Sequence, residues 1–251
     1  MSGVEGKVAL VTGGAGGLGA ATCEALAAAG ARIVVADVDV AGGEAVAERV
    51  GGAFVHTDVS DLDSNLAAVA FAGDAYGGLD LVHLNAGIAS FCSLGEDFDP
   101  QLYRRAIGVN LDGVVFGVHA ALPALKARGG GAIVATASLA GLTGVPLDPI
   151  YAANKHAVVG LTRSLGPALL GDGIRMNAVC PGFAESAIVD PIREYLAEQG
   201  YKIIPAPAVA AAVMSLFTGD MSGECWFVQP DREPEAFRFR RVPGPGKEVT
   251  A

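Results

Sequence analysis

The sequence predicts one α/β domain built on a doubly wound parallel sheet, with about seven strands and helices on both faces. Short apolar segments alternate with longer helical segments from residue 4 to about residue 230. The apolar segments are hydrophobic almost throughout rather than at every second residue, as expected for strands buried on both faces of a sheet. No Pro/Ser-rich or charge-rich linker interrupts residues 1–230. We therefore expect one domain over 1–230, followed by a tail at 231–251.

The expected elements follow one another with short connections. The strands are predicted at 7–11, 32–36, 53–57, 79–85, 131–137, 174–180 and 224–229, and the helices near 17–29, 41–50, 62–76, 100–127, 151–170 and 206–217. The helix from residue 100 has a clear start, because Asp99 can cap its N-terminus and Pro100 suits its first position. Segments 183–204 and 231–251 have no clear strand partner.

A glycine-rich turn, Thr12 to Gly19, joins the first expected strand to the first helix. Glycines let a diphosphate approach the backbone, and the helix N-terminus presents free N–H groups to it. The second strand ends at Asp37, whose carboxylate can accept hydrogen bonds from both hydroxyls of an adenosine ribose. This order of features predicts dinucleotide binding. The candidate contacts are Gly13, Gly16, Gly17, Leu18, Gly19, Asp37 and the adjacent Val38.

Asp37 also favours NAD over NADP as the cofactor. A 2′-phosphate about 4 Å from its carboxylate would be repelled by a few kcal/mol at an effective dielectric of about 20. Binding sites for that phosphate usually supply Arg or Lys. Here the glycine turn has neither, and the residues after Asp37 are Val38, Asp39 and Val40.

Tyr151 and Lys155 are four residues apart, which is about one helical turn, so their side chains share a helix face. A positive charge about 4 Å from the phenol would favour the phenolate by roughly 4 kcal/mol, or about 3 pKa units, at an effective dielectric of about 20. The pair is therefore a candidate for general acid–base work. A surface Tyr beside a solvated Lys is the alternative.

These residues together resemble the short-chain dehydrogenase/reductase family over roughly residues 4–230. The match begins with the turn Thr-Gly-x-x-x-Gly-x-Gly and includes Ser138, Tyr151 and Lys155 as a catalytic set, to which the family adds Asn110. The resemblance implies a Rossmann fold. It also implies further cofactor contacts at Asp58, Val59, Asn85, Ala86, Gly87, Pro181, Gly182 and Ser186, besides Tyr151 and Lys155 themselves. Two departures are Asn154, where a small residue is usual, and the charged tail after Pro230.

The resemblance implies an NAD-dependent oxidoreductase that exchanges a hydride between the nicotinamide and a secondary alcohol or its ketone. Tyr151 would carry the hydroxyl proton, and Lys155 would lower the Tyr151 pKa and hold the nicotinamide ribose. Ser138 would hydrogen-bond the substrate oxygen, while Asn110 would hold a water linked to Lys155. The alternatives are an NADP-dependent carbonyl or 3-oxoacyl-thioester reductase, and a dinucleotide sensor without catalysis.

The substrate is expected to be apolar, because the segments near the catalytic residues are apolar. The family closes a lid over substrate at about 183–204. Steroid, terpenoid, aryl-alkyl carbinol and 3-hydroxyacyl substrates all remain open, and ordinary packing explains the same residues equally well. Arg104 and Arg105 are expected in a solvated or subunit-facing stretch and not in an anion site. The candidate substrate contacts are Leu139, Ile150, Phe183, Ile188 and Ile192.

Composition restricts the partners. The 27 acidic residues outnumber the 17 basic ones, for a net charge of −10, which argues against nucleic acid or an anionic membrane as a partner.

The 4 cysteines show neither disulfide nor metal-ligand spacing, so we expect no metal. The N-terminus lacks a signal-peptide pattern and the apolar run 113–125 is shorter than the ~20 residues of a membrane span, so a cytoplasmic protein is expected. Small residues on the 151–170 helix, with the resemblance, imply a homo-oligomer, either a dimer or a tetramer.

The tail carries a short alternating pattern. Phe237 and Phe239 alternate with Arg238 and Arg240, which would place the two rings on one side of an extended chain. The tail is expected either to reach across a subunit interface or to be disordered.

Overall fold

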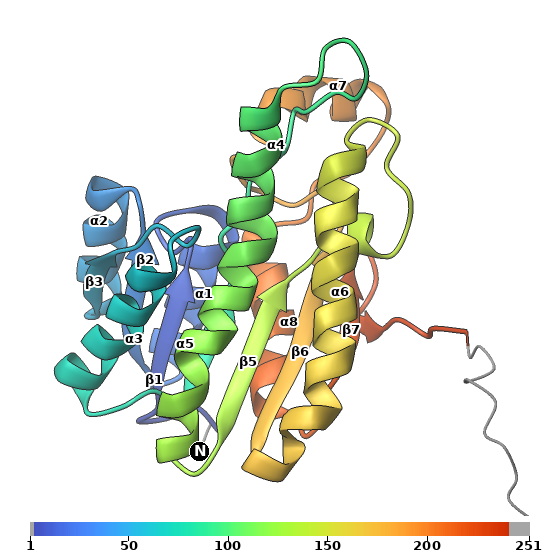
Figure 1. Ribbon diagram of the computed structural model, residues 1–251. Helices are drawn as coiled ribbons and strands as arrows, with labels where there is room; N and C mark the ends of the chain where they lie inside the picture. Colours follow the sequence, from blue (N-terminus) through green and yellow to red (C-terminus); the bar gives the residue numbers. More distant parts are fainter. Residues whose placement is uncertain (1–2, 241–251) are drawn as a thin grey trace, which may run out of the picture.

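A computed structural model describes residues 3–240 and shows a three-layer α/β fold around one 8-stranded sheet (Figure 1). The order of the strands is β3-β2-β1-β4-β5-β6-β7-β8, and all neighbours are parallel except β7 and β8. The predicted doubly wound Rossmann fold is thereby confirmed.

The strands are β1 (Val8–Thr12), β2 (Arg32–Asp37), β3 (Ala53–His56), β4 (Leu81–Leu84), β5 (Gly131–Thr136), β6 (Ile174–Pro181), β7 (Cys225–Val228) and β8 (Glu235–Ala236). The helices are α1 (Gly17–Ala28), α2 (Val40–Val50), α3 (Leu62–Tyr76), α4 (Pro100–Ile107), α5 (Gly113–Ala127), α6 (Pro149–Leu169), α7 (Arg193–Glu198) and α8 (Ala206–Thr218). A π-helical turn at Gly108–Asp112 joins α4 to α5, and short 3₁₀ turns occur at Leu139–Gly141, Leu170–Asp172 and Asp190–Ile192.

Each face of the sheet is covered by three helices. Buried residues of α3, α5 and α6 pack on one face, and buried residues of α1, α2 and α8 pack on the other (Figure 1). The central strands need apolar residues at every position because their side chains enter both layers in turn. In β1, for example, Val8 and Leu10 face the first layer, whereas Ala9 and Val11 face the second.

The strand order reverses between β1 and β4, which are neighbours in the sheet. A crevice for a ligand forms at such a reversal, outside the carboxyl ends of the strands. The segments at that edge are the glycine turn after β1 and the loop after β4, which begins at Asn85. The topology thus brings the predicted dinucleotide motif to the edge where the other predicted residues also lie.

Two segments that lacked a predicted strand partner have one. In the tail, Glu235–Ala236 forms β8, which pairs antiparallel with the open edge of β7. In the lid, Ala184 forms an isolated parallel bridge with Ile204, and α7 lies between them. A strand of two residues is too short to show a period, so no hydrophobic pattern predicts β8.

The tail packs on the body of the protein as far as it is described. The rings of Phe237 and Phe239 meet edge to face, and the Arg163 guanidinium lies 3.8 Å from the centre of the Phe239 ring. The part of the predicted tail from residue 241 onward lies outside the described residues.

The predicted helix 100–127 is one continuous helix that contains the π turn. By length and composition alone, Pro100–Ala127 is long enough and apolar enough to cross a membrane, contrary to the estimate from the shorter run 113–125. In this fold its buried side packs against the sheet and α3, so the apolar composition has an explanation inside the protein.

The four cysteines are buried and unpaired, as predicted. Within residues 3–240 no cluster of three or more His, Cys, Asp or Glu side chains could hold a metal ion.

Candidate active site

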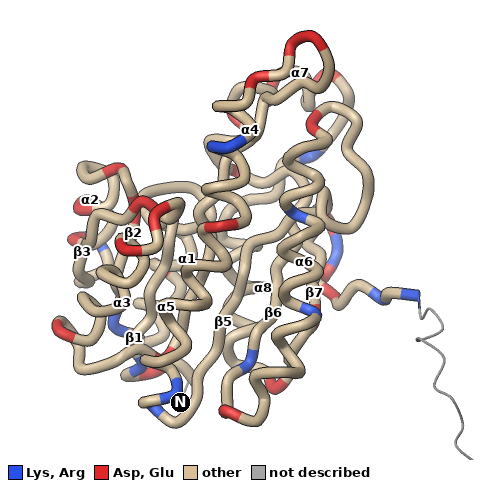
Figure 2. Tube along the Cα trace, in the orientation of Figure 1, with Lys and Arg blue, Asp and Glu red and all other residues tan. Residues whose placement is uncertain are grey.

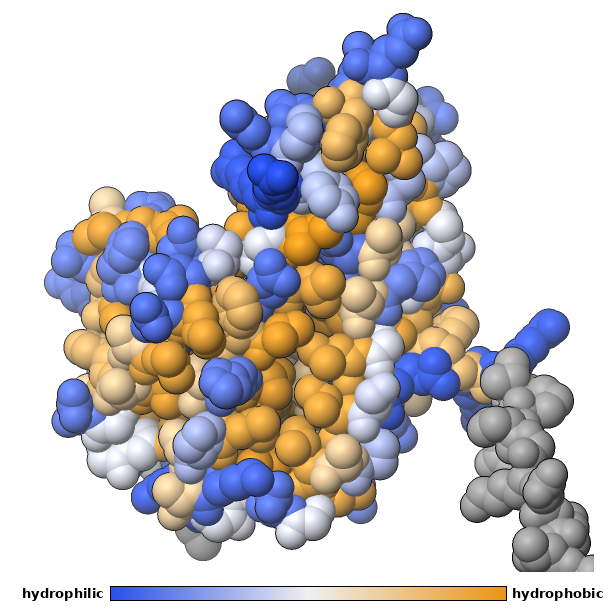
Figure 3. All heavy atoms as spheres, viewed as in Figure 1, coloured by the Kyte–Doolittle hydropathy of each residue, from blue (hydrophilic) through white to orange (hydrophobic). Residues whose placement is uncertain are grey.

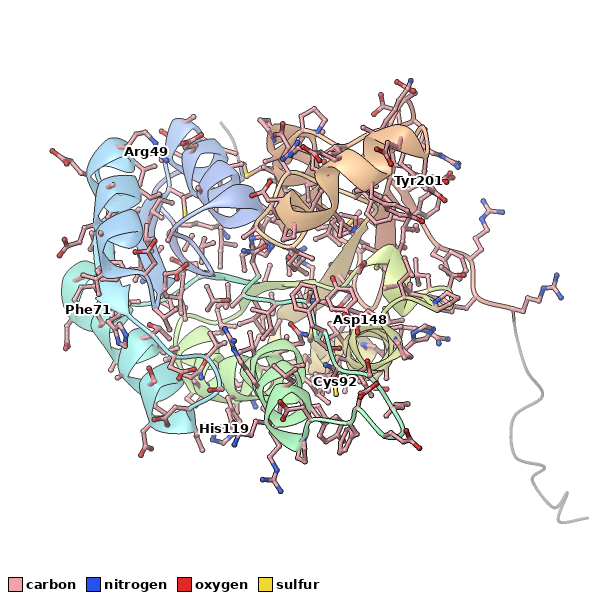
Figure 4. All side chains as sticks on the ribbon, turned by 90° about the horizontal axis from the view of Figure 1, so that it is seen from above. Arg49, Phe71, Cys92, His119, Asp148 and Tyr201 are labelled. Atoms are coloured by element: carbon pink, nitrogen blue, oxygen red, sulfur yellow. The ribbon has the colours of Figure 1, made fainter. Side chains whose placement is uncertain are left out.

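The structure brings together the predicted catalytic residues from three different elements. Ser138 follows β5, Tyr151 and Lys155 lie in the first turns of α6, and Asn110 lies in the π turn before α5. The Tyr151 hydroxyl lies close enough to the Ser138 hydroxyl for Ser138 to affect its pKa, while Ser138 Oγ donates a hydrogen bond to Pro181 O at 3.4 Å. The ammonium of Lys155 lies 5.6 Å from the centre of the Tyr151 ring. Asp148 and Cys92 lie at this edge, across from Tyr201 in the lid segment (Figure 4).

Burial controls the acidity of both groups. It raises the pKa of Tyr151 to about 12, with the Ser138 hydroxyl opposing the rise and the charge of Asp148 adding to it. Burial also lowers the pKa of Lys155 to about 8. The net shift of the Tyr151 pKa is therefore upward, because desolvation of the phenolate is its largest cause, and the lowering of this pKa by Lys155 stays a prediction. At neutral pH the phenol holds its proton.

Lys155 is almost fully buried, yet its ammonium is only partly satisfied. Its Nζ donates a hydrogen bond to the carbonyl oxygen of Thr136 at 2.8 Å, and no other acceptor for Nζ is found among the described residues. A Cβ added to Gly87 would lie 3.4 Å from this Nζ and 3.3 Å from Asn110 Oδ1. The missing side chain at Gly87 thus leaves a gap in which a ligand hydroxyl could accept a hydrogen bond from Lys155.

Asn110 fixes the loop that follows β4. Its Oδ1 accepts a hydrogen bond from Ile88 N, and its Nδ2 donates one to Ile88 O, both at 2.9 Å. The π turn makes this reach possible, since such turns displace one residue from the regular helical ladder. The role of Asn110 in holding a water beside Lys155 stays a prediction.

The glycine turn and the start of α1 fit a diphosphate. Gly16 lies at the N-cap of α1 with no side-chain cap, and the first turn of the helix has no acidic residue. A Cβ at Gly16 would meet nothing within 4 Å, so the free amides of this helix end are open to an anion. Gly13 and Gly19 serve the turn itself, because a Cβ at Gly13 would lie 2.8 Å from Ala86 Cα and one at Gly19 would lie 2.0 Å from Gly13 O.

Asp37 lies against this turn as predicted. Its Oδ2 accepts a hydrogen bond from Ala15 N at 2.9 Å, and its Oδ1 accepts one from Asp39 N at 3.0 Å. Each oxygen keeps a lone pair for a ribose hydroxyl. Among residues 3–240 no Lys or Arg forms an ion pair with Asp37.

The other predicted cofactor residues line the same edge. Val38 is exposed beside Asp37, whereas Val59 is buried. Asp58 Oδ1 accepts hydrogen bonds from the backbone N–H and the hydroxyl of Ser60. Gly182 packs near Leu139, and Ser186 donates a hydrogen bond to Ala184 O. A Cβ at Gly17 would lie 3.4 Å from Ser186 Cα, so the start of the lid touches the glycine turn close to Leu18.

A buried polar chain beneath the site was not predicted from the sequence. Asn85 Nδ2 donates hydrogen bonds to Thr12 O and Gly13 O, so its Oδ1 accepts one from Thr136 Oγ1 at 3.1 Å. His83 Nε2 lies 2.9 Å from the same Thr136 oxygen, whose proton is already used. His83 must therefore carry its proton on Nε2 and donate it to Thr136. The chain connects the support of Lys155 to the glycine turn.

The predicted substrate residues are only partly gathered around one hollow. A cavity of about 180 Å³ lies between the loop after β4, α4 and the lid, and of the five predicted residues only Ile188 lines it. Phe183 instead packs on Tyr201, with ring centres 5.4 Å apart, and Ile192 lies in the 3₁₀ turn of the lid. Leu139 and Ile150 remain neighbours of Ser138 and Tyr151 in the chain.

Sequence reasoning missed most of the cavity wall. Its lining residues are Gly87, Ile88, Ala89, Ser90, Phe91, Leu102, Arg105, Ala187 and Ile188. Arg105 is exposed, as expected for a solvated stretch, and it also lines this hollow. The loop's position directly after a strand at the carboxyl edge was the available signal.

Comparison with known proteins identifies the family. Residues 7–197 match the family described as short chain dehydrogenase. The chain is 42% identical over 190 residues to trans-4-hydroxycyclohexanecarboxylate dehydrogenase of Sinomonas cyclohexanicum, covering 71% of this chain and 73% of that protein. It is 40% identical over 197 residues to 3-alpha-(or 20-beta)-hydroxysteroid dehydrogenase of Mycobacterium bovis, and the match covers 77% of this chain and 75% of that protein.

The fold matches as well. The structure of levodione reductase superposes with a TM-score of 0.84 at 32% identity, covering 90% of this chain and 96% of that one. Such enzymes act on CH–OH groups with a nicotinamide cofactor. The chain is a member of the short-chain dehydrogenase family.

Proposed function

We propose that the protein is an NAD-dependent dehydrogenase that oxidises a secondary alcohol carried on a ring, and reduces the corresponding ketone in reverse. The observation that carries the proposal is the position of Tyr151 close to Ser138 and beside the buried, partly satisfied ammonium of Lys155. A protein that only sensed a dinucleotide would need no such proton-handling pair next to its binding edge.

The chemistry divides among the side chains of the site. When bound, the oxidised cofactor supplies the hydride acceptor and a positive ring charge that adds to that of Lys155. Ser138 donates a hydrogen bond to the substrate oxygen and holds it where charge develops. Tyr151 accepts the hydroxyl proton in oxidation and returns it in reduction. Lys155 stabilises the phenolate by its charge and binds the nicotinamide ribose through the donors that face the gap at Gly87.

The choice of NAD rests on Asp37. Its carboxylate lies within the glycine turn and is not neutralised by any described Lys or Arg, so a 2′-phosphate there would meet uncompensated negative charge. We expect a preference for NAD over NADP of at least about a hundredfold in kcat/KM, which corresponds to roughly 3 kcal/mol.

The ring-borne alcohol is supported by the two relatives, since one is named for a hydroxysteroid and the other for a hydroxycyclohexane acid. The walls of the cavity support a ring-borne alcohol as well, because they are mostly apolar.

We further propose a cytoplasmic homo-oligomer. Apolar side chains gather on the face of α5 and α6 (Figure 3), where Val115 is exposed and Phe116, Leu161 and Leu165 are half-buried.

The test is a screen for NADH formation across secondary alcohols that includes cyclohexanols, steroids and 3-hydroxyacyl thioesters, with NAD and NADP compared on the best substrate. Tyr151→Phe should lose turnover by more than about a hundredfold and keep its affinity for NADH within about threefold. Near-normal turnover in Tyr151→Phe would falsify the assignment.

Asp37→Asn is the matched variant for the cofactor. The amide oxygen can still accept the hydrogen bond from Ala15 N, whereas the exposed Asp39 N loses its acceptor and turns to water, so the charge is removed together with one exposed hydrogen bond. The preference for NAD should narrow by about tenfold or more. An unchanged preference would show that another group selects the cofactor.

A further inference from the structure

The cavity beside the site is sized for one ring. Its volume of about 180 Å³ is slightly larger than the roughly 150 Å³ that holds a benzene molecule in an engineered protein cavity. Its walls are mainly apolar and come from three elements, with Ile88, Phe91, Leu102 and Ile188 as their largest apolar side chains. A fused four-ring system would have to extend well beyond this space.

Two parts of the cavity lining differ in chemistry. One is Gly87, which lies next to Asn110 and to the ammonium of Lys155. The other is Arg105 on α4, the charged residue of the lining, five positions before Asn110 in the same continuous helix. Five residues of helix span about 7 Å, so a molecule with its hydroxyl at the Lys155 end can have a second polar group near Arg105.

Arg105 has no acidic partner in the described part of the chain. Two acidic side chains of the surrounding segments are already engaged: Asp99 caps α4, and Asp148 accepts hydrogen bonds from Ser90 and from the first turn of α6. In the lid, Asp190 pairs with Arg193. Figure 2 shows the basic pair Arg104–Arg105 on α4 as a positive point below the acidic loops at the top of the molecule. The guanidinium is therefore free to bind an anion.

We propose that the substrate is a ring-borne secondary alcohol that also carries a carboxylate, and that Arg105 binds this carboxylate. The inference rests on the proposed function, because it adds a second polar group to the same substrate. A guanidinium matches a carboxylate with two parallel hydrogen bonds, a geometry that a neutral hydroxyl or amide does not reproduce. Since the protein carries a net charge of −10, an acid is not attracted to it in general, and a local cation must supply the recognition.

The experiment compares 4-hydroxycyclohexanecarboxylate with its primary amide, which has the same shape and no charge. In the wild-type protein kcat/KM should be about ten- to a hundredfold higher for the acid, as expected for a charge-assisted hydrogen bond. Arg105→Met should bring the ratio of acid to amide close to one, mainly through KM of the acid, and Arg105→Lys should give an intermediate ratio. Arg104→Met is the control, since adjacent residues do not share a helix face, and its ratio should stay within about twofold of wild type.

A binding measurement separates failure of this inference from failure of the proposed function. Calorimetry with cyclohexanecarboxylate, which has no hydroxyl to oxidise, should show a Kd about ten- to a hundredfold weaker in Arg105→Met than in wild type, both loaded with NADH. If neither ring alcohol is oxidised but this difference is present, the proposed reaction fails and the anion site stands. If the amide is used as well as the acid, or Arg104→Met loses as much as Arg105→Met, the assignment of Arg105 is overturned.

Discussion

Ser90 and Asp148 are joined by two hydrogen bonds, although 58 residues separate them in the chain. The backbone N–H of Ser90 donates to Asp148 Oδ2 at 2.9 Å, and its hydroxyl donates to Asp148 Oδ1. The same carboxylate caps α6, because Oδ1 also accepts a hydrogen bond from Tyr151 N at 3.0 Å. One side chain thus ties a wall of the cavity to the backbone of the residue proposed to carry the proton.

The charge of Asp148 should affect the acidity of Tyr151 through this contact. Burial is the main reason why the pKa of Tyr151 is raised, and the negative charge of Asp148 raises it further. Asp148→Asn keeps the cap on Tyr151 N, but its amide nitrogen faces Ser90 N in place of an acceptor, so the free energy of unfolding should fall by about 1–3 kcal/mol. Without the charge the Tyr151 pKa falls, and the rise of alcohol oxidation with pH should move to lower pH. The pH profile of kcat/KM is the measurement.

Asp99→Asn provides the matched control for this prediction. Asp99 caps α4 through Gln101 N and Leu102 N, as Asp148 caps α6, but its charge is not among the causes of the Tyr151 shift. Its pH profile should coincide with that of the wild type. A shift of equal size in both variants, or none in Asp148→Asn, would show that the Asp148 charge does not act on the phenol.

Lys155 should make the folded protein less stable at neutral pH. Its folded pKa of about 8 lies below the ordinary value of 10.5, so burying the charged form costs about 3 kcal/mol below pH 8. This cost disappears as pH rises from 8 to 10.5, where the unfolded chain also loses its proton. Lys155→Met removes this cost of burying a charge. It also leaves Thr136 O without its hydrogen-bond donor, which destabilises the variant by about 1 kcal/mol.

We therefore expect Lys155→Met to be about 2 kcal/mol more stable than the wild type at pH 7 and no more stable at pH 10.5. Urea unfolding followed by circular dichroism at the two pH values measures the difference. The variant should also lose most turnover. Lys126→Met, at an exposed lysine on α5, should show no such pH-dependent gain. A gain in stability that persists unchanged at pH 10.5 contradicts the prediction.

His83 should limit stability in acid. Burial lowers its pKa to about 3, against 6.5 ordinarily, so the folded protein holds the neutral ring. The contribution of this pKa difference to the free energy of unfolding is complete above pH 6.5 and is lost as pH falls toward 3. About 2 kcal/mol of it is lost at pH 5. His83→Gln keeps a donor for Thr136 and does not titrate. The variant should lose less unfolding free energy than the wild type between pH 7 and pH 5.

The same substitution at exposed His119 on α5 is the control for His83→Gln, and its loss between the two pH values should match that of the wild type. If His83→Gln and the wild type lose the same free energy between pH 7 and pH 5, the buried ring does not act as the acid-sensitive group.

The sequence was sufficient for the sheet, the glycine turn and the order of the site residues, because each depends on local patterns. Apolar runs without alternation predict buried parallel strands, and Asp37 follows such a run directly. The acidity of Tyr151 could not be predicted, since it depends on how deeply the phenol is buried. The direction of Arg105 could not be predicted either. The π turn at 108–112 inserts a residue and so rotates the side chains before it by about 100° relative to those after it.

The last prediction concerns the gap at Gly87. A Cβ there would lie 3.3 Å from Asn110 Oδ1 and 3.4 Å from Lys155 Nζ, which is tighter than most Cβ contacts, so these side-chain ends must shift by a few tenths of an ångström; Gly87 does not need a positive φ. Gly87→Ala should therefore fold with a melting temperature within a few degrees of the wild type, as for a change of about 1 kcal/mol or less. It should still weaken NADH binding by about tenfold, because the methyl group occupies the space in which a ligand hydroxyl would meet Lys155.

Gly73→Ala is the matched control for Gly87→Ala. Gly73 lies in α3, and a Cβ there would meet nothing within 4 Å, so the change should raise stability by up to about 1 kcal/mol and leave NADH binding unaltered. Fluorescence titration with NADH and thermal unfolding separate the two effects. If Gly87→Ala bound NADH as tightly as Gly73→Ala, the donors of Lys155 would have to meet the cofactor somewhere other than the gap beside Asn110.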